Sequence, residues 1–184
     1  MEKPAILFVC LGNICRSPLA EAAFRKAAQE AELEAEADSA GTADYHVGSP
    51  PDPRSVDEAA RRGIDISGYA GRQLSVEDFD RFTHIFAMDH QNLRNIEALR
   101  PNGSRAQVSL LMDLVPGREG AAIADPYHDG EEQFEATWED VEEAAKTLVA
   151  KLASQRAHSS GVIAGSMAVH PPRNVRTPIS RSCR

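Results

Sequence analysis

Two residues near the start of the chain have the types and the spacing for nucleophilic chemistry on phosphorus. Cys10 stands six positions before Arg16, with Gly12 and Asn13 between them. A thiolate is a strong nucleophile, and nearby amides and cations lower a cysteine pKa from about 8.5 to roughly 3.5–7.5. A planar guanidinium binds two oxygens of a phosphoryl group at once. The pair therefore predicts attack of the Cys10 sulfur on phosphorus and a phosphocysteine intermediate.

The residues around this pair predict a strand, a tight loop and a helix. Residues 5–10 form an apolar run typical of a buried strand, and residues 18–31 are rich in strong helix formers. Ser17 suits the N-cap of that helix and Pro18 its first position. A loop of this kind points its backbone N–H groups at one spot, where a phosphate dianion fits.

The loop itself is the predicted phosphate-binding element. Gly12 and Asn13 most readily take the positive φ that such a loop needs. Beyond the catalytic pair, the expected phosphate-binding residues are Leu11, Gly12, Asn13, Ile14, Cys15 and Ser17. The alternative is that Cys10 is a buried thiol at a strand end and Arg16 a surface residue of the helix. The agreement of strand, turn, helix start and position favours the catalytic interpretation.

The segment VCLGNICRSP at residues 9–18 resembles the signature loop of the low-molecular-weight protein tyrosine phosphatases. The resemblance covers about residues 4–153 and continues through SAGT at 39–42, GSPPDPR at 48–54, MD at 88–89 and DPY at 125–127. It implies hydrolysis of phosphotyrosine in protein substrates without a cofactor or metal. It also implies inhibition by phosphate- and vanadate-like anions, and a monomer or a weak dimer.

Apolar runs and helical segments alternate along the rest of the chain, which predicts an α/β fold in a single domain. Further strands are expected at residues 35–40, 83–88 and 106–112. Further helices are expected at residues 53–63, 76–81, 91–99 and 133–152. The alternation implies a four-stranded parallel sheet with helices on both faces, a three-layer arrangement of the flavodoxin-like or Rossmann-like kind.

Ligand sites in such sheets lie beyond the carboxyl ends of the strands, and several candidate residues fall at that edge. They are Cys10, Ser39, Asp89 and the loop after Met112. The resemblance implies that Ser39 holds Asn13 in place and that Asp89 supports the phosphate loop. On the residues alone, Ser39 is a turn residue and Asp89 an N-cap.

The loop before the last helix supplies the acid that this chemistry requires. A thiolate that attacks phosphorus needs an acid to protonate the departing oxygen and then a base to activate water, and one carboxyl group can do both. Asp125, followed by Pro126, is the candidate, with Asp129 as its competitor. An Asp-Pro pair alone is a common turn signal, but the resemblance implies that Asp125 is the general acid and base.

Aromatic residues on two loops are candidates for the walls of the substrate cleft. The resemblance implies that Tyr45 and Tyr127 lie on opposite sides of a flat phosphoaryl group. Many relatives carry a second aromatic residue where this chain has His128, which leaves the substrate preference open. Cys15 is a small buried residue, the partner of Cys10 in a reversible disulfide, or both.

Composition limits the class of protein. The 184 residues carry a formal net charge of −8, which argues against a nucleic-acid partner. Three cysteines, two of them in the loop, are typical of a reduced cytoplasmic protein, and no apolar segment is long enough for a membrane span. Residues 155–184 hold five arginines and no acid, so we expect a phosphatase domain at 1–154 and a basic, disordered tail at 155–184.

Three alternative functions compete with phosphotyrosine hydrolysis. Arsenate reductases of similar fold need a further pair of cysteines, and this chain has none between Cys15 and Cys183. Protein arginine phosphatases resemble the same loop but tend to carry threonine at the position of Ile14. A non-catalytic phosphate-binding module would make Arg16 and Asp125 dispensable together. Hydrolysis of phosphotyrosine is the leading hypothesis.

Overall fold

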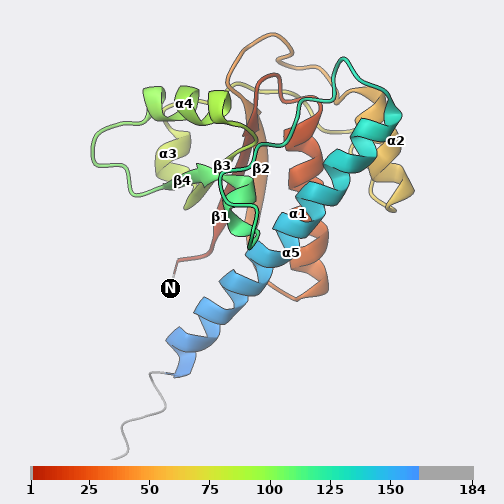
Figure 1. Ribbon diagram of the computed structural model, residues 1–184. Coiled ribbons are helices and arrows are strands. Elements are labelled where there is room, and N and C mark those ends of the chain that lie inside the picture. Colours follow the sequence, from red (N-terminus) through yellow and green to blue (C-terminus); the bar gives the residue numbers. More distant parts are fainter. Residues whose placement is uncertain (1, 162–184) are drawn as a thin grey trace, which may run out of the picture.

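The strand that ends at Cys10 is an inner strand of a four-stranded parallel sheet (Figure 1). The computed structural model describes residues 2–161. In their spatial order across the sheet, the strands are β2 (Glu36–Gly41), β1 (Ala5–Cys10), β3 (His84–Ala87) and β4 (Gln107–Leu110). All six residues of β1 are buried, as expected of a parallel strand covered on both faces. The predicted α/β class and parallel sheet are confirmed.

Helices cover both faces of this sheet and make three layers. The helices are α1 (Arg16–Glu30), α2 (Pro53–Arg61), α3 (Asp78–Arg81), α4 (His90–Leu99) and α5 (Glu131–Gly161). α1 and α5 pack together on one face with α2 beside them, and α3 and α4 lie on the other (Figure 1). Alternate residues of β1 serve the two layers, with Phe8 in the core beneath α1 and Leu7 in the core beneath α4. Between residues 2 and 161, none of the helices combines the length and apolar character that a membrane span requires.

The last helix is longer than its sequence pattern predicted. The inner face expected between Phe134 and Leu152 is buried against the rest of the molecule. α5 continues to Gly161, however, so the expected end near Leu152 is wrong and the first residues of the expected tail are helical. Residues 153–160 are exposed, and a helix without a buried face has no apolar period to detect. The rest of the expected tail, residues 162–184, lies outside the described residues.

Two further boundaries differ from the sequence predictions. α1 begins at Arg16, so Ser17 lies inside the first turn and is not the N-cap of the helix. Its hydroxyl bonds within the preceding loop instead. The fourth strand stops at Leu110, and Leu111–Leu114 form a 3-10 turn (η1) in place of a strand that continues to Met112.

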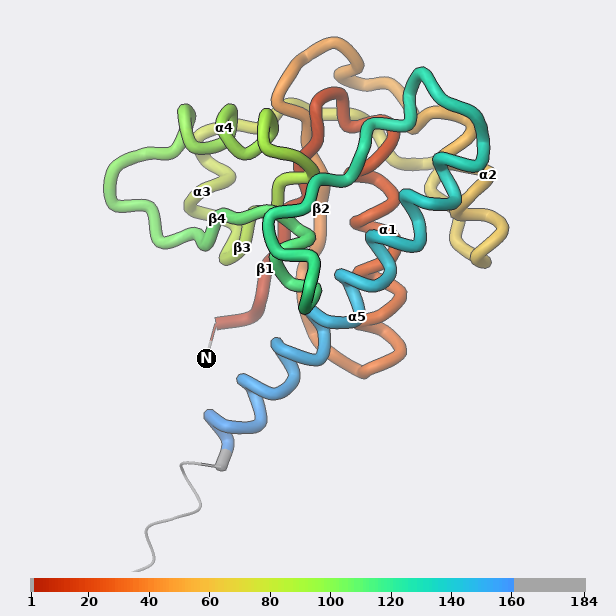
Figure 2. Tube along the Cα trace, in the orientation of Figure 1, coloured from red at the N-terminus to blue at the C-terminus, as the bar shows by residue number. Residues whose placement is uncertain are grey.

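The loops that follow the strands gather at one edge of the sheet. Figure 2 shows the loop after β1 in red, the loop after β2 in orange and the segment before α5 in teal at the same end of the molecule. Main-chain bonds join them: the Ala43 N–H donates to the Leu11 carbonyl at 3.0 Å, and the Ile123 N–H to the Met88 carbonyl at 2.8 Å. A Cβ at Gly41 would lie 2.7 Å from the Leu11 oxygen, so a glycine is needed where the first two loops meet.

Candidate active site

The loop between β1 and α1 wraps around the sulfur of Cys10. Asn13 has a φ of 59°, in the left-handed region, and its N–H lies 3.3 Å from Cys10 Sγ. Gly12 has no positive φ, but its missing Cβ leaves room for the His46 ring, which such an atom would approach to 3.0 Å. The expected positive φ is therefore confirmed for Asn13 and wrong for Gly12.

Two polar groups lie within hydrogen-bond distance of that sulfur. The Ser17 hydroxyl is 3.1 Å from Cys10 Sγ, and the Asn13 N–H approaches from the loop side. Cys10 is only 3% exposed and faces the N-terminal turn of α1 through Ser17. Donors and a helix N-terminus stabilise negative charge on an atom held in this way. Ser17 thus serves the sulfur rather than the end of the helix.

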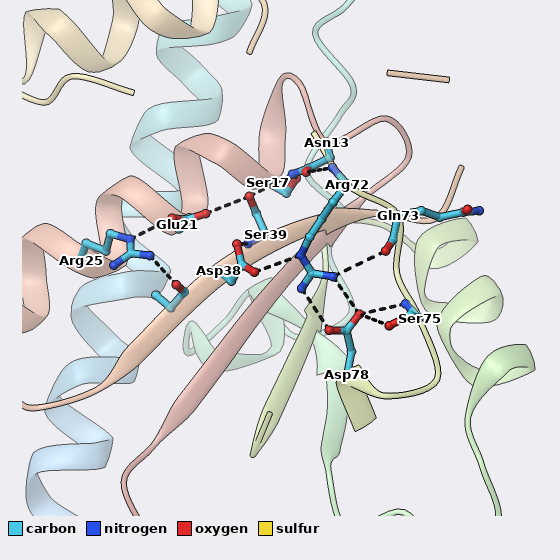
Figure 3. A network of polar contacts seen from close by, with 11 residues as sticks. Asn13, Ser17, Glu21, Arg25, Asp38, Ser39, Arg72, Gln73, Ser75 and Asp78 are labelled. Carbon is cyan, nitrogen blue, oxygen red and sulfur yellow. Dashed lines mark hydrogen bonds and ion pairs between the residues drawn. The ribbon is translucent and has the colours of Figure 1, made fainter. Parts of the chain in front are cut away.

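A chain of buried side chains holds the loop from behind (Figure 3). The Asn13 amide donates to the hydroxyl oxygens of Ser17 and Ser39, at 2.9 Å in each case. The amide oxygen of Asn13 accepts from the backbone N–H of Arg72 at 3.1 Å. Ser39 in turn donates to Glu21 at 2.9 Å. Every polar group of the Asn13 side chain has a partner, and a fully satisfied buried network fixes one conformation of the loop.

Charged groups that the sequence predictions missed complete this network. Glu21 is 4% exposed, and burial raises its pKa even though Arg25 bonds it at 2.8 Å. Arg72 forms ion pairs of 3.0 Å with Asp38 and Asp78. Glu21 lies one helical turn beyond the loop and four positions before Arg25. This i, i+4 spacing of opposite charges on the expected helix was an available signal for the ion pair. Arg72 binds the loop through its backbone, which leaves no signal in the residue type.

Arg16 is buried at the base of the site and bridges two acids. Its Nη1 donates to Asp89 Oδ2 at 2.7 Å and to the Ile123 carbonyl at 2.9 Å. Its Nη2 lies 3.6 Å from Asp125 Oδ2. The other oxygen of Asp89 accepts the Asn92 N–H at 2.7 Å, so this one carboxylate both caps α4 and bonds Arg16.

Asp125 stands on an exposed segment opposite the loop. Its side chain is 43% exposed, and its Oδ1 accepts the Tyr127 N–H at 3.1 Å. Asp129, the competitor for the acid role, is exposed and does not line the cavity next to Cys10. The geometry therefore brings Asp125, and not Asp129, to the same cavity as the sulfur.

The loop and this segment enclose a cavity of about 230 Å³. The predicted site residues that line it are Cys10, Leu11, Gly12, Ile14, Cys15, Arg16, Tyr45, Asp125 and Tyr127. The side chains of Tyr45 and Tyr127 are among the exposed ones, as expected at a mouth. His46, which carried no sequence signal, and His128 complete the lining. The other predicted residues do not line the cavity, and their side chains bond to one another or to Arg16: Asn13, Ser17, Ser39 and Asp89.

Cys15 lines the cavity but is not equivalent to Cys10. Burial, together with the nearby carboxylate of Asp52, raises the pKa of Cys15 to about 12. At neutral pH Cys15 is therefore a neutral thiol, and neutral thiols are poor nucleophiles. Cys10 is left as the candidate nucleophile of the loop.

A parallel α/β sheet with a cysteine–arginine anion loop at its carboxyl edge, faced by an aspartate, is the arrangement of a cysteine-dependent phosphatase. The family model described as "Low molecular weight phosphotyrosine protein phosphatase" matches residues 5–158. The chain belongs to this family of hydrolases, and relatives similar in sequence are named as protein-tyrosine phosphatases.

Individual relatives agree in sequence and in structure. A low molecular weight phosphotyrosine protein phosphatase of Schizosaccharomyces pombe is 48% identical over 132 residues, which are 70% of this chain and 84% of the relative. The crystal structure of YfkJ from Bacillus subtilis superimposes with a TM-score of 0.78 at 34% identity, over 85% of this chain and 98% of that one. The crystal structure of DARP, a Drosophila arginine phosphatase, has a TM-score of 0.75 at 32% identity, over 80% and 96% of the two chains.

Proposed function

We propose that this protein hydrolyses phosphotyrosine in protein substrates through a phosphocysteine intermediate. The observation that carries the proposal is the meeting of Cys10, Arg16 and Asp125 on one cavity, with Arg16 Nη2 3.6 Å from Asp125 Oδ2. A nucleophile, an oxyanion-binding fork and a proton donor are the three groups that the reaction needs.

In the first step the Cys10 thiolate attacks phosphorus and the bond from phosphorus to the tyrosine oxygen breaks. The guanidinium of Arg16 and the N–H groups of the loop bind the non-bridging oxygens, where charge accumulates in the transition state. Asp125, in its acid form, gives its proton to the departing phenolate oxygen. The products are free tyrosine on the substrate protein and a phosphorylated Cys10.

In the second step the carboxylate of Asp125 takes a proton from water while the water oxygen attacks phosphorus. The phosphorus–sulfur bond breaks, inorganic phosphate leaves, and Asp125 regains its acid form. The departing sulfur returns to a thiolate beside the Ser17 hydroxyl, 3.1 Å away. The same loop would hold phosphate and vanadate, so we expect both anions to inhibit competitively.

The lining of the cavity favours a phosphoaryl substrate over the alternatives. Ile14 is apolar and offers no hydroxyl to the guanidinium of a phosphoarginine, whereas Tyr45 and Tyr127 offer rings to a phenyl group. Arsenate reduction would need a further resolving pair of thiols, which the three cysteines of the sequence do not provide. A non-catalytic phosphate-binding module needs no carboxyl group beside the phosphate site, and the position of Asp125 next to Arg16 therefore favours an enzyme.

The test is turnover of an aryl phosphate by the purified protein in the presence of a chelator, beside Cys10→Ser and Asp125→Ala. We expect the wild type to turn over, Cys10→Ser to be inactive, and Asp125→Ala to be about 10²–10⁴-fold slower. Peptides with phosphotyrosine, phosphoserine or phosphoarginine then identify the substrate class. If the wild type binds vanadate but hydrolyses none of these substrates, the proposed enzymatic activity is contradicted and a phosphate-binding module is supported.

We also propose a cytoplasmic location and a monomer or weak dimer. The two cysteines of the loop support the location, because Cys10 acts only while it is reduced. Cell fractionation and size-exclusion chromatography test these two statements, and secretion of the chain with oxidised loop cysteines would contradict the first.

A further inference from the structure

Arg54 connects the segment that carries Asp125 to the rest of the molecule. Its Nη1 donates to the carbonyl of Asp129 and its Nη2 to the carbonyl of Tyr127, both at 2.8 Å. Within the part of the chain that the structure describes, no other side chain donates a hydrogen bond to residues 125–129. Apart from the 3.6 Å ion pair between Arg16 and Asp125, these two bonds are the polar side-chain attachment of the segment.

The guanidinium of Arg54 is itself held in place from two sides. Its Nε and Nη2 each bond one carboxylate oxygen of Asp52 at 3.0 Å. Its Cζ lies over the Phe134 ring at the start of α5, 4.5 Å from the ring centroid, and 5.9 Å from the centroid of the Tyr127 ring. A guanidinium that bonds a carboxylate on one side and two carbonyls on the other, and lies over an aromatic ring, has little conformational freedom left.

Asp52 links this arginine to the phosphate loop. Its backbone N–H donates to the Ile14 carbonyl at 2.8 Å, and its Oδ1 also caps α2 by accepting the Arg54 N–H at 2.9 Å. A continuous path of hydrogen bonds therefore runs from Ile14 through Asp52 and Arg54 to the segment of Asp125. The path connects the nucleophile loop to the segment that carries the acid.

We propose that Arg54 is a positioning residue that holds Asp125 over the phosphate loop, an inference that rests on the proposed role of Asp125 as general acid. Misplacement of a catalytic group by about 1 Å costs on the order of 10²-fold in rate. Arg54 does not line the cavity, so its loss leaves phosphate binding and thiolate attack intact. The loss of Arg54 impairs proton transfer from Asp125 to the leaving oxygen.

The experiment measures kcat/KM for a series of aryl phosphates whose phenols range from strongly to weakly acidic. A good leaving group needs no proton, whereas a poor one depends on the acid. For Arg54→Ala we expect a fall of about 10–100-fold with the least acidic phenol and less than about 3-fold with the most acidic one. Competitive inhibition by vanadate should stay within about 2-fold of the wild type, because the loop is unchanged.

Lysine should not replace this arginine, because a compact ammonium cannot bond two carbonyls and two carboxylate oxygens in one plane. Arg54→Lys and Arg54→Gln are therefore expected to show the same dependence on the leaving group, and they report the result even if the alanine variant folds poorly. Arg54→Ala should add nothing further in an Asp125→Ala background, since both changes act on the same proton.

Arg62→Ala is the matched control. Arg62 lies just beyond α2 and bonds Glu58 at 3.1 Å, and its Cζ lies over the Trp138 ring, 5.8 Å from the centroid. It makes no hydrogen bond or ion pair with residues 125–130. The Arg62→Ala variant should show a small change in kcat/KM that is the same for every aryl phosphate of the series.

Equal losses at Arg54 for all leaving groups, or full activity of Arg54→Lys, would overturn the inference while Asp125→Ala still showed the steep dependence. If Asp125→Ala lowered kcat/KM equally for all leaving groups, the proposed role of Asp125 as general acid would be overturned instead.

Discussion

The loop at residues 10–17 and the segment at residues 125–130 face each other across one cavity, yet they are built differently. Asn13, Arg16 and Ser17 are at most 3% exposed. Asn13 and Ser17 belong to a network that reaches Ser39 in the sheet and Glu21 in α1, and Arg16 bonds Asp89 and the Ile123 carbonyl. The opposite segment is exposed at every residue except Pro126 and receives its side-chain hydrogen bonds from Arg54.

This difference matches the two tasks. Transition-state charge is best stabilised by dipoles that are fixed before the reaction, which favours a loop embedded in the core. A group that first gives a proton and then takes one from water must be reached by solvent. We therefore expect changes in the loop to lower stability and activity together, and changes in the opposite segment to lower activity alone.

Asn13→Ala should give the largest combined effect. It removes the amide that donates to the Ser17 and Ser39 hydroxyls and accepts from the Arg72 N–H, and it puts alanine at a positive φ, so the free energy of unfolding should fall by about 3 kcal/mol. The displaced N–H groups of the loop should lower kcat/KM about 100-fold or more. Urea denaturation and aryl phosphate turnover measure the two effects.

Asp125→Asn is the counterpart across the cavity. Its unfolding free energy should stay within about 0.5 kcal/mol of the wild type, because the side chain is exposed. Its turnover of phosphotyrosine should nevertheless fall about 10²–10⁴-fold. If Asn13→Ala and Asp125→Asn lost equal stability, the loop at residues 10–17 and the segment at residues 125–130 would not differ as described.

Glu21→Gln should produce a smaller effect that depends on pH. Burial raises the pKa of Glu21 above its ordinary 4.5, so the folded protein holds this proton more tightly than the unfolded chain. The contribution to stability is full below pH 4.5 and is lost as the pH rises through the folded-state pKa. The stability of the variant relative to the wild type should therefore increase from pH 4 upward, as urea midpoints at several pH values will show. Parallel profiles would contradict a raised pKa.

Tyr45→Leu should have the smallest effect. Tyr45 is 73% exposed and lines the mouth of the cavity, so its ring packs little against the protein and is available to the substrate. Loss of ring stacking should raise KM for a phosphotyrosine peptide about 3-fold without changing the thermal midpoint. Tyr45→Phe keeps the ring and should behave as the wild type, and an equal rise in KM for both variants would argue against stacking.

Local sequence signals predicted the parts of the site that depend on neighbours in the chain. Asp89 was expected at a strand end with an N-cap spacing, and it caps α4 while bonding Arg16. Residues 5–10 were expected as a buried strand, and β1 has these bounds. Ser17 was expected to be the N-cap because serine suits that position and Pro18 suits the first helical position. In the structure its hydroxyl bonds the sulfur of Cys10 instead.

Contacts with main-chain atoms far along the sequence were not predicted. Arg54 bonds carbonyls more than 70 positions away, and Arg16 bonds that of Ile123. Any residue type provides a carbonyl, so the sequence carries no mark of such an acceptor. The roles of Cys10 and Asp125 in the reaction stay predictions until the variants are measured.

The bonds that Arg16 makes to Asp89 and to the Ile123 carbonyl also bear on conformational entropy. A free arginine side chain carries about 2 kcal/mol of rotamer entropy, which an exposed residue loses when it closes on a ligand. Arg16 loses that freedom when the chain folds. The arrival of a dianion then orders almost nothing, and part of the affinity of the site for phosphate is already contained in the folding free energy of the protein.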